Sequence, residues 1–314
     1  MKIKDLCSYA PKSKIKAGEA VENAKYIFFT SSADENKRYT DFQFDKEAII
    51  MGTGGNATLH YYNGKFSVST DCLVLFPNSK IKCKYLYYFF KSHMSVLEAG
   101  FKGAGLKHTN KKYIEEINVS EVPDLTTQEK IIFHLDTISG NIEKLNRELE
   151  LFDSLTKARF IEMFGDPVLN ERKFPTLSGA DFFKLSNGRA VPDEKRIEAG
   201  IPAYGGNGIS WYTDEFLMAE DTIVVGRVGF QSGNVHYVIG PLWITDNAMY
   251  ISQYDKDKFN LRFLYELMQH VNFSRFQDAG DLKKITQKPF MTFKYILPSM
   301  DLQQKFVNFK IESR

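Results

Sequence analysis

Apolar residues near the middle of the chain recur with a heptad spacing. They step alternately by four and three positions, and the positions between them are mostly polar or charged. We call this stripe the heptad seam; it consists of Ile131, Leu135, Ile138, Ile142, Leu145, Leu149 and Phe152. Such a seam is typical of a coiled coil and needs a second helix to cover it. We predict one helix of about 38 residues, capped by Thr126 or Thr127 and ended by Gly165-Asp166-Pro167.

The regions on either side of this helix have a different pattern. Short β-branched and aromatic runs alternate there with Gly, Asn and Asp, which indicates strands joined by tight turns. The runs "AIIMG" (48–52) and "TIVVG" (222–226) read as strands that end at a glycine, whereas residues 84–97 and 261–271 have helical spacing. We therefore predict an α+β fold, in which a twisted sheet with packed helices lies on each side of a long helix of the coiled-coil type.

The two flanking regions are copies of one module. Their matching segments occur in the same order, and the match places Gly52 on Gly226, Gly55 on Gly229, and Thr70-Asp71 on Thr245-Asp246. The aligned pairs are 48–75 with 222–251, 84–90 with 262–268, 106–114 with 282–290, and 122–131 with 297–306. We predict similar domains at 1–123 and 168–299, separated by the helical segment 124–167. Residues 300–314 then repeat only the start of that helix.

Composition limits the class of protein. Of the 314 residues, 43% are hydrophobic and 25% are charged, which is typical of a soluble globular protein. No apolar run is long enough to span a membrane, so we expect a cytoplasmic protein. Three cysteines without a C-x-x-C spacing favour reduced, buried thiols over disulfides or zinc.

The formal net charge of +2 does not by itself indicate a nucleic-acid partner. The basic residues do cluster, in residues 11–16, 80–84, 107–112 and 281–288. Each cluster could be a solvated surface or a set of phosphate contacts, and the charge pattern alone leaves both open.

Motifs for catalysis are missing from the sequence. There is no Asn/Asp-Pro-Pro-Tyr motif of a base-flipping methyltransferase, and "MGTGGNA" (51–57) lacks the Gly-Lys-Ser/Thr of a phosphate-binding loop. The six histidines have no metal-ligand spacing, and "PDEK" (192–195) reads as a surface turn. Asp71 and Asp246 are interpreted as buried, turn-forming aspartates. We predict no catalytic residues and no metal site.

The central segment "LTTQEKIIFHLDTISGNIEKLNRELELFDSLTKARFIEMFGDP" (125–167) resembles the central conserved helix of type I restriction-modification specificity (S) subunits. Residues 200–217 and 226–249 are similar to target recognition domains of the same family. The resemblance covers essentially the whole chain, and its parts come in the family's order.

The resemblance implies a non-catalytic, bacterial or archaeal DNA-reading subunit. Each recognition domain would read one half of a bipartite, asymmetric DNA target, and the helix would hold the two halves a fixed distance apart. Family members bind two methyltransferase (M) subunits and, in some complexes, restriction (R) subunits. The complex methylates adenine at N6 and acts as an ATP-dependent endonuclease. S-adenosylmethionine, ATP and Mg are therefore expected only in the partner subunits, with no cofactor in this chain.

Sequence-specific DNA-binding proteins contact phosphates with basic side chains and recognise base edges with polar side chains, which we expect here on loops. The loop candidates in the first module are Lys12, Lys14, Lys16, Thr53, Asn56, Lys65, Lys107 and His108. Those in the second module are Arg189, Tyr204, Asn207, Arg227, Gln231, Ser232, Lys283 and Lys284. The resemblance carries over the role of each domain and does not assign any of these side chains.

Family members usually end with a second long helix that matches the central one. Only residues 300–314 correspond to it here, so most of the heptad seam would lack a cover. We hypothesise that another copy of the chain or a methyltransferase subunit covers it. The alternative function is a coiled-coil scaffold with two end domains that bind protein or carbohydrate, since an aromatic content of 14% suits such surfaces too.

Overall fold

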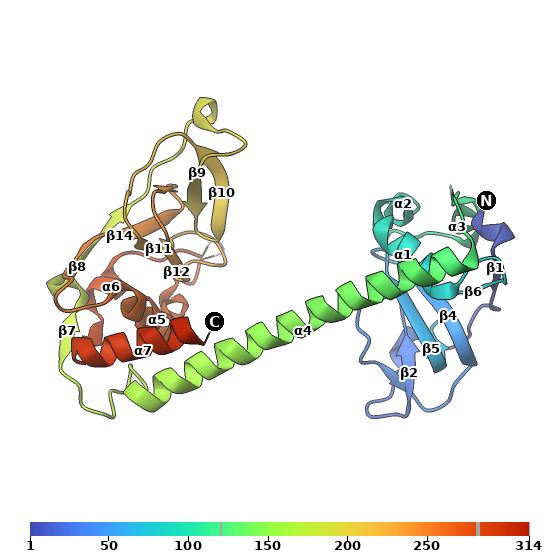
Figure 1. The fold of residues 1–314 in the computed structure, drawn as a ribbon, viewed down its shortest axis with the longest axis horizontal. Coiled ribbons are helices and arrows are strands. Elements are labelled where there is room, and N and C mark those ends of the chain that lie inside the picture. Colours follow the sequence, from blue (N-terminus) through green and yellow to red (C-terminus); the bar gives the residue numbers. More distant parts are fainter. Residues whose placement is uncertain (120, 281–282, 314) are drawn as a thin grey trace. The chain divides into compact units, whose positions relative to one another are not determined.

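The computed structural model describes residues 1–119, 121–280 and 283–313. The chain forms two compact units, Met1–Asn146 and Arg147–Arg314, and helix α4 (Leu125–Phe164) runs from the first into the second (Figure 1). Leu282, which begins one of the aligned repeat segments, and Arg314 lie outside the described residues.

The first unit is built on a six-stranded sheet with the order β1-β6-β4-β5-β2-β3. All neighbouring strands are antiparallel except β2 and β5. The strands are β1 (Cys7–Tyr9), β2 (Tyr26–Phe29), β3 (Arg38–Tyr39), β4 (Phe44–Gly52), β5 (Leu59–Val68) and β6 (Cys72–Pro77). Three further helices follow them, namely α1 (Cys83–Ser92), α2 (Met94–Glu98) and α3 (Lys111–Glu116).

The second unit contains a four-stranded antiparallel sheet with the order β12-β11-β14-β8, which matches β5-β4-β6-β1 of the first unit. Its strands are β8 (Phe183–Asn187), β11 (Thr222–Gly226), β12 (Val235–Val238) and β14 (Ala248–Tyr254). Two small sheets accompany it, made of β9 (Ile201–Gly205), β10 (Gly208–Thr213) and β13 (Trp243–Ile244), and of β7 (Thr176–Ser178) and β15 (Lys294–Ile296). The helices are α5 (Leu261–Val271), α6 (Lys288–Thr292) and α7 (Met300–Glu312).

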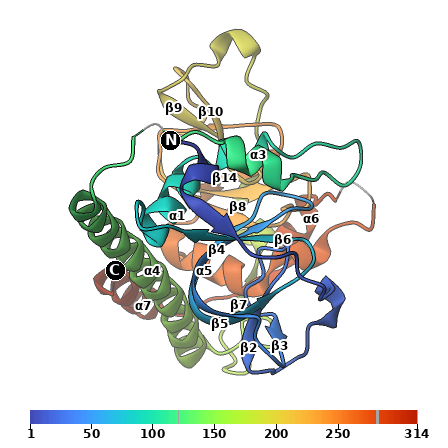
Figure 2. The same ribbon diagram turned by 90° about the vertical axis from the view of Figure 1, so that its right-hand side faces the viewer.

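The larger core cluster of the first unit lies between one face of its sheet and helix α1 (Figure 2), and a second cluster, which includes Ile50, Phe66 and Cys72, packs on the other face. Leu86 and Phe90 of α1 pack in the larger cluster with Ile49 and Leu75 of the sheet. The three cysteines are buried free thiols, as predicted. Burial raises the pKa of Cys7 to about 12 and that of Cys72 to about 11, so both thiols are protonated and unreactive near neutral pH.

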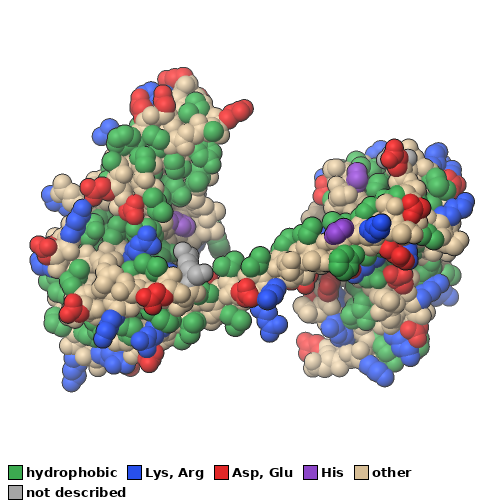
Figure 3. Space-filling model, in the orientation of Figure 1, with side chains coloured by type: hydrophobic (Ala, Val, Ile, Leu, Met, Phe, Trp, Pro, Cys, Tyr) green, Lys and Arg blue, Asp and Glu red, His purple; other side chains and the backbone are tan. Residues whose placement is uncertain are grey.

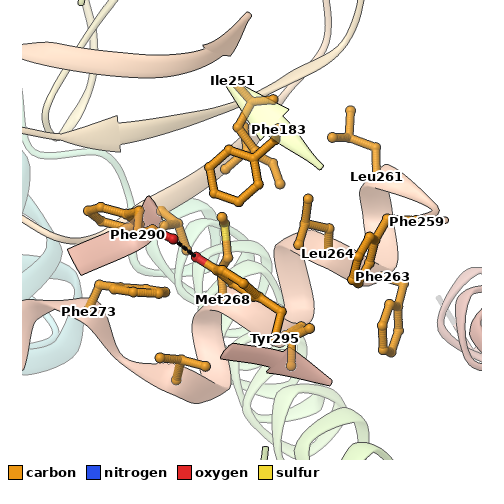
Figure 4. Packing of buried hydrophobic residues seen from close by; sticks show 14 of the residues in the cluster. Phe183, Ile251, Phe259, Leu261, Phe263, Leu264, Met268, Phe273, Phe290 and Tyr295 are labelled. Carbon is orange, nitrogen blue, oxygen red and sulfur yellow. Dashed lines mark hydrogen bonds between the residues drawn. The ribbon is translucent and has the colours of Figure 1, made fainter. Parts of the chain in front are cut away.

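The core of the second unit is rich in aromatic rings (Figure 4). Phe182 stacks on Phe259 with ring centroids 4.1 Å apart, and Phe273 stacks on Phe290 at the same distance. The buried Tyr295 hydroxyl donates a hydrogen bond to the Phe290 carbonyl at 3.1 Å, so its one polar atom has a partner inside the core.

The hydrogen bonds confirm the predicted duplication and correct its register. Gly52 pairs with Cys72 at the end of β4, and Gly226 pairs with Ala248 at the end of β11. Asp71 therefore corresponds to Asn247, one residue beyond the partner that the sequence alignment gave. Asp71 and Asp246 do lie in turns, but both side chains are exposed, so the interpretation as buried aspartates was wrong. A turn at the end of a sheet opens to solvent even when the strands beside it are buried.

Helix α4 has 40 residues and ends before Gly165, whose φ of 71° is left-handed, as the Gly-Asp-Pro sequence predicted. Its N-cap is neither of the predicted threonines. Asp124 accepts a hydrogen bond from the Thr127 amide at 2.9 Å, so this carboxylate satisfies the free amide at the helix start.

The heptad seam is half-buried at both of its ends and exposed in its middle. Ile138, Ile142, Leu145 and Leu149 are 52–62% exposed, and Figure 3 shows apolar side chains along this part of α4. Residues 131 and 135 border a groove of about 470 Å³ that α1 completes with Tyr85, Tyr88 and Phe89. The seam therefore has unrealised apolar burial, as predicted.

In the second unit the matching groove is filled. Phe160 and Phe164 of α4 pack against Phe306 of α7, with ring centroids 5.4 and 5.8 Å apart, and Phe160 stacks on His270 of α5 at 3.9 Å. Burial in this contact lowers the pKa of His270 to about 4, with Lys157 adding to the effect. The end of α4 thus supplies the helix that covers α5 and α7.

Gln128 anchors the start of α4 to the first unit. Its side chain is fully buried, and its oxygen accepts a hydrogen bond from the Lys82 amide at 2.7 Å. Its amide group donates to the carbonyls of Lys80 at 3.2 Å and Pro123 at 2.8 Å. One side chain therefore ties the loop before α1 to the loop before α4.

Gln303 repeats this arrangement at the start of α7. It too is fully buried, and it accepts a hydrogen bond from the Asn260 amide at 2.9 Å. It donates to the carbonyls of Lys258 at 2.9 Å and Pro298 at 3.0 Å. The two glutamines occupy the same position of the duplicated module, although their surroundings have diverged.

Candidate nucleic-acid interface

The loop that follows β4 forms one end of the first unit. Its Gly55 amide donates to the Lys107 carbonyl at 2.9 Å, and the Thr109 amide donates to the Thr53 carbonyl at 3.0 Å. Gly55 has a φ of 82°, a conformation that favours glycine. These bonds bring together four of the sequence candidates, Thr53, Asn56, Lys107 and His108.

Two of the three N-terminal lysines lie near the same loop. The Thr70 amide donates to the carbonyl of Ile15 at 2.8 Å, and the Thr53 amide donates to the carbonyl of Asp71 at the same distance. Lys14 and Lys16 flank Ile15 and are exposed, and Lys12 is exposed further along the same segment.

Lys65 is not part of this group. It pairs with Asp45 in the sheet, seven residues before the end of β4 at Gly52. At about 3.3 Å per residue this places Lys65 roughly 23 Å from the loop. Its ammonium lies 3.8 Å from the Asp45 carboxylate and 4.6 Å from the centre of the Phe42 ring. Lys65 is only seven residues from Thr58 in the sequence, but an extended strand carries it to the opposite end of the sheet.

The second unit has an equivalent loop after β11, and we call each of these two loops, with the residues beside it, the loop edge of its unit. The Gly229 amide donates to the Lys283 carbonyl at 2.8 Å, and the Ile285 amide donates to the Arg227 carbonyl at 3.0 Å. Gly229 has a φ of 93°, matching that of Gly55. Arg227, Lys283 and Lys284 therefore lie beside one loop, which also presents the exposed Gln231.

Ser232 is a wrong candidate. Its side chain is fully buried, and its amide donates to the Gly229 carbonyl at 3.0 Å. It holds the loop from inside, so it does not face a DNA ligand.

Only the turn of the β9–β10 hairpin lies close to this loop edge. Gly206 lies against Gly226, where a Cβ atom on Gly206 would be 3.3 Å from the Gly226 Cα, so the adjacent Tyr204 and Asn207 lie near the edge. Arg189 joins them, because its amide donates to the Ile244 carbonyl at 2.8 Å. The other end of the hairpin has an excess of acidic residues: Asp193, Glu194, Glu198, Asp214 and Glu215 lie there with only two basic residues, Lys195 and Arg196, which are ion-paired with Glu215 and Asp193. A polyanion would be attracted to the first end and repelled by the second.

Sequence reasoning missed one prominent residue of the second edge. Phe230 lies at the tip of the loop and is 89% exposed, the highest value among the large apolar side chains of the described residues. The available signal was the length of the loop, since seven residues separate Gly226 from Asn234 where five separate Gly52 from Thr58.

Clusters of metal-ligating side chains and membrane-spanning helices were sought in the described part of the chain. Among residues 1–119, 121–280 and 283–313, no group of three or more His, Cys, Asp or Glu side chains is placed to hold a metal ion. No described helix is both long enough and apolar enough to cross a membrane. Residues 192–195, the suspected turn, include a short 3₁₀ helix at Asp193–Lys195.

A protein family accounts for both units. The family described as "Type I restriction modification DNA specificity domain" matches the chain twice, over residues 1–151 and 174–309. A type I specificity subunit from Mycoplasma pneumoniae is 25% identical over 97% of this chain and 86% of its own length. One from Mycoplasma genitalium is 22% identical over 89% of this chain and 77% of its own length.

A solved structure has the same fold. The S subunit of a type I restriction-modification system from M. genitalium superposes with a TM-score of 0.76 at 18% identity, covering 100% of this chain and 88% of that one. The type I MpnII specificity subunit of M. pneumoniae is 32% identical over 48% of this chain and 47% of its own length. With two matched domains that together span most of its length, this chain belongs to the family of type I restriction-modification DNA specificity subunits.

Proposed function

We propose that this chain reads a bipartite DNA target, with one half-site bound at the loop edge of each unit. The observation that carries the proposal is the pair of loop edges built on the same hydrogen-bond frame, at Gly55 and at Gly229. Basic and polar side chains surround each frame, as DNA contacts require. The two edges carry different residues, so the half-sites should differ in sequence and the whole target should be asymmetric.

We further propose that this chain is the non-catalytic member of a larger assembly. Methyltransferase subunits would bind S-adenosylmethionine and methylate adenine at N6, and restriction subunits, where present, would use ATP and Mg. The role of this chain is then to place the catalytic subunits on a particular sequence.

The methylome of a host cell tests this function. Co-expression of the chain with its methyltransferase subunit should add N6-methyladenine at one split motif whose two parts differ, as detected by single-molecule sequencing. A methyltransferase subunit expressed without this chain is the control and should leave the motif unmethylated. An active methyltransferase that adds no new methylation, or that methylates a continuous motif, would contradict the proposal.

The exposed middle of the heptad seam is proposed to bind the same segment of a second copy. When two such helices are placed antiparallel about the midpoint of the exposed stretch from Ile138 to Leu149, Ile142 faces Leu145 of the other copy, Ile138 faces Leu149, and Leu135 faces Phe152. Every seam residue in that stretch then meets an apolar partner, which is the packing of an antiparallel coiled coil. Full burial of each such side chain contributes about 1.5–3 kcal/mol.

Polar substitutions in the seam should abolish this pairing. We expect Ile142→Glu with Leu145→Glu to convert a two-chain species into a single chain of 36.1 kDa, measured by light scattering without other subunits. The matched control is Gly140→Glu with Ser154→Glu, which adds the same charge on the opposite face of α4, where a Cβ on Gly140 meets no atom within 4 Å. A wild-type chain that is monomeric alone, and that pairs only when the methyltransferase is added, would assign the seam to that subunit instead.

A further inference from the structure

Phe230 occupies a position where an aromatic ring is costly. Its side chain is 89% exposed, and the polar residues Gln231 and Asn234 lie in the same loop, joined by a hydrogen bond of 2.6 Å. Leaving such a ring in water forgoes the stabilisation that its burial would give. A single exposed apolar side chain is common on protein surfaces, so Phe230 draws its significance from the loop that holds it and from the charges beside it.

Residues outside the loop hold the backbone on both sides of Phe230 in place. The Gln277 side chain donates hydrogen bonds to the carbonyls of Phe230, at 3.2 Å, and Ser232, at 2.5 Å. The Gly229 amide is bonded to the Lys283 carbonyl, and Gly233 lies so close to Ser274 that a Cβ on it would be 2.7 Å from the Ser274 amide nitrogen. The backbone that carries the ring is therefore fixed before any ligand binds, which reduces the entropic cost of using it.

The charges around the ring favour nucleic acid as the ligand. Arg227, Lys283 and Lys284 border the loop, together with two described acidic residues: Asp246, whose carbonyl accepts a hydrogen bond from the Arg227 side chain, and Asp278. Asp278 also accepts a hydrogen bond from the Lys284 amide at 2.9 Å. Cations at the base of an exposed ring would hold phosphates while the ring enters the duplex, which is how apolar wedges act on DNA.

We propose that Phe230 is a wedge that inserts between two neighbouring base pairs of the half-site read by the second unit. The inference rests on the proposed DNA-reading function and adds a residue and a mode of recognition to it. The equivalent loop of the first unit has the same frame but is two residues shorter, and it presents the polar Asn56 instead of a ring. The wedge therefore acts at one half-site only, and it selects base steps that unstack easily.

The test uses the complex with its methyltransferase and a duplex that carries the methylated motif. 2-Aminopurine replaces each adenine in turn, so that its fluorescence reports unstacking, and energy transfer between the duplex ends reports bending. The wild-type complex should unstack one step and bend the duplex. Phe230→Ala should abolish both signals and weaken binding roughly tenfold to a hundredfold, the range found for lost base stacking. Phe230→Trp should retain both signals.

The control substitution is Ile239→Ala, which removes an exposed apolar side chain beyond the opposite end of β12 and should change neither signal. A wild-type complex that binds the duplex without unstacking any step would overturn the wedge and leave the proposed function intact. The wedge is also overturned if the Phe230→Ala complex keeps both signals. It is overturned as well if the only effect of Phe230→Ala is that the chain no longer binds the methyltransferase subunit. A wild-type complex that does not bind the duplex at all overturns the proposed function, and the wedge with it.

Discussion

Replacing Gln303 with leucine is expected to lower the free energy of unfolding of the second unit by about 3–5 kcal/mol. The substitution leaves one amide and two carbonyls without their hydrogen-bond partner in a fully buried site. Each buried polar group that loses its partner costs about 1–3 kcal/mol. Urea denaturation of the full chain, followed by circular dichroism, measures the change. Gln128→Leu should have a comparable effect on the first unit, because its three bonds are the same.

The neighbouring glutamine is the control for this substitution. Gln304 is exposed, and it accepts a hydrogen bond from the Asn260 side chain at 3.0 Å. Gln304→Leu should cost less than about 1 kcal/mol, since water replaces a lost partner at an exposed site. If both leucine variants unfold at the same urea concentration, the buried glutamine is not an anchor of α7.

Removal of the positive charge at the second loop edge should have the largest effect on DNA binding. We expect Arg227→Gln, Lys283→Gln and Lys284→Gln together to weaken binding of the target duplex on the order of 100-fold near 0.1 M salt, because three phosphate contacts are lost. The slope of log affinity against log salt concentration should fall in magnitude by about 2 to 3. Fluorescence anisotropy of the complete complex at several salt concentrations measures both quantities.

Three exposed lysines of the same unit provide a charge-matched control. Lys184 of β8, Lys294 of β15 and Lys305 of α7 are exposed, and none of them belongs to the loop edge. Their replacement by glutamine removes the same charge and should leave affinity within a few-fold of the wild type. Equal losses in the two triple variants would show that net charge, and not this edge, determines binding.

The sequence was sufficient for the architecture because several signals agreed. The heptad spacing predicted α4, the glycines at 52 and 226 predicted the strand ends, and the ordered repeats predicted two similar units. The alignment was wrong by one residue at Asp71, since turns between strands tolerate small differences in length that sequence letters do not reveal. Paired backbone hydrogen bonds resolve the register, because each bond fixes which residues face each other.

The candidate interface was harder to predict. Basic and polar residue types identified the loops at Thr53 and Arg227, but they could not show that Ser232 is buried or that Lys65 lies at the far end of its sheet. Those properties depend on tertiary packing, which changes the exposure of a residue without changing its type. Phe230 was overlooked for the opposite reason, because an aromatic residue is normally assigned to the core.

The two buried glutamines bear on how this protein can change over time. All the atoms they bond in the loops beside them belong to the main chain, so substitutions among the neighbouring side chains leave those bonds intact. A recognition domain from a related chain could therefore be joined at Pro123 or Pro298, and the glutamine would still anchor the helix that follows. If each unit reads one half-site, as proposed above, recombination at these joints would combine half-site specificities anew without any change in the joint itself.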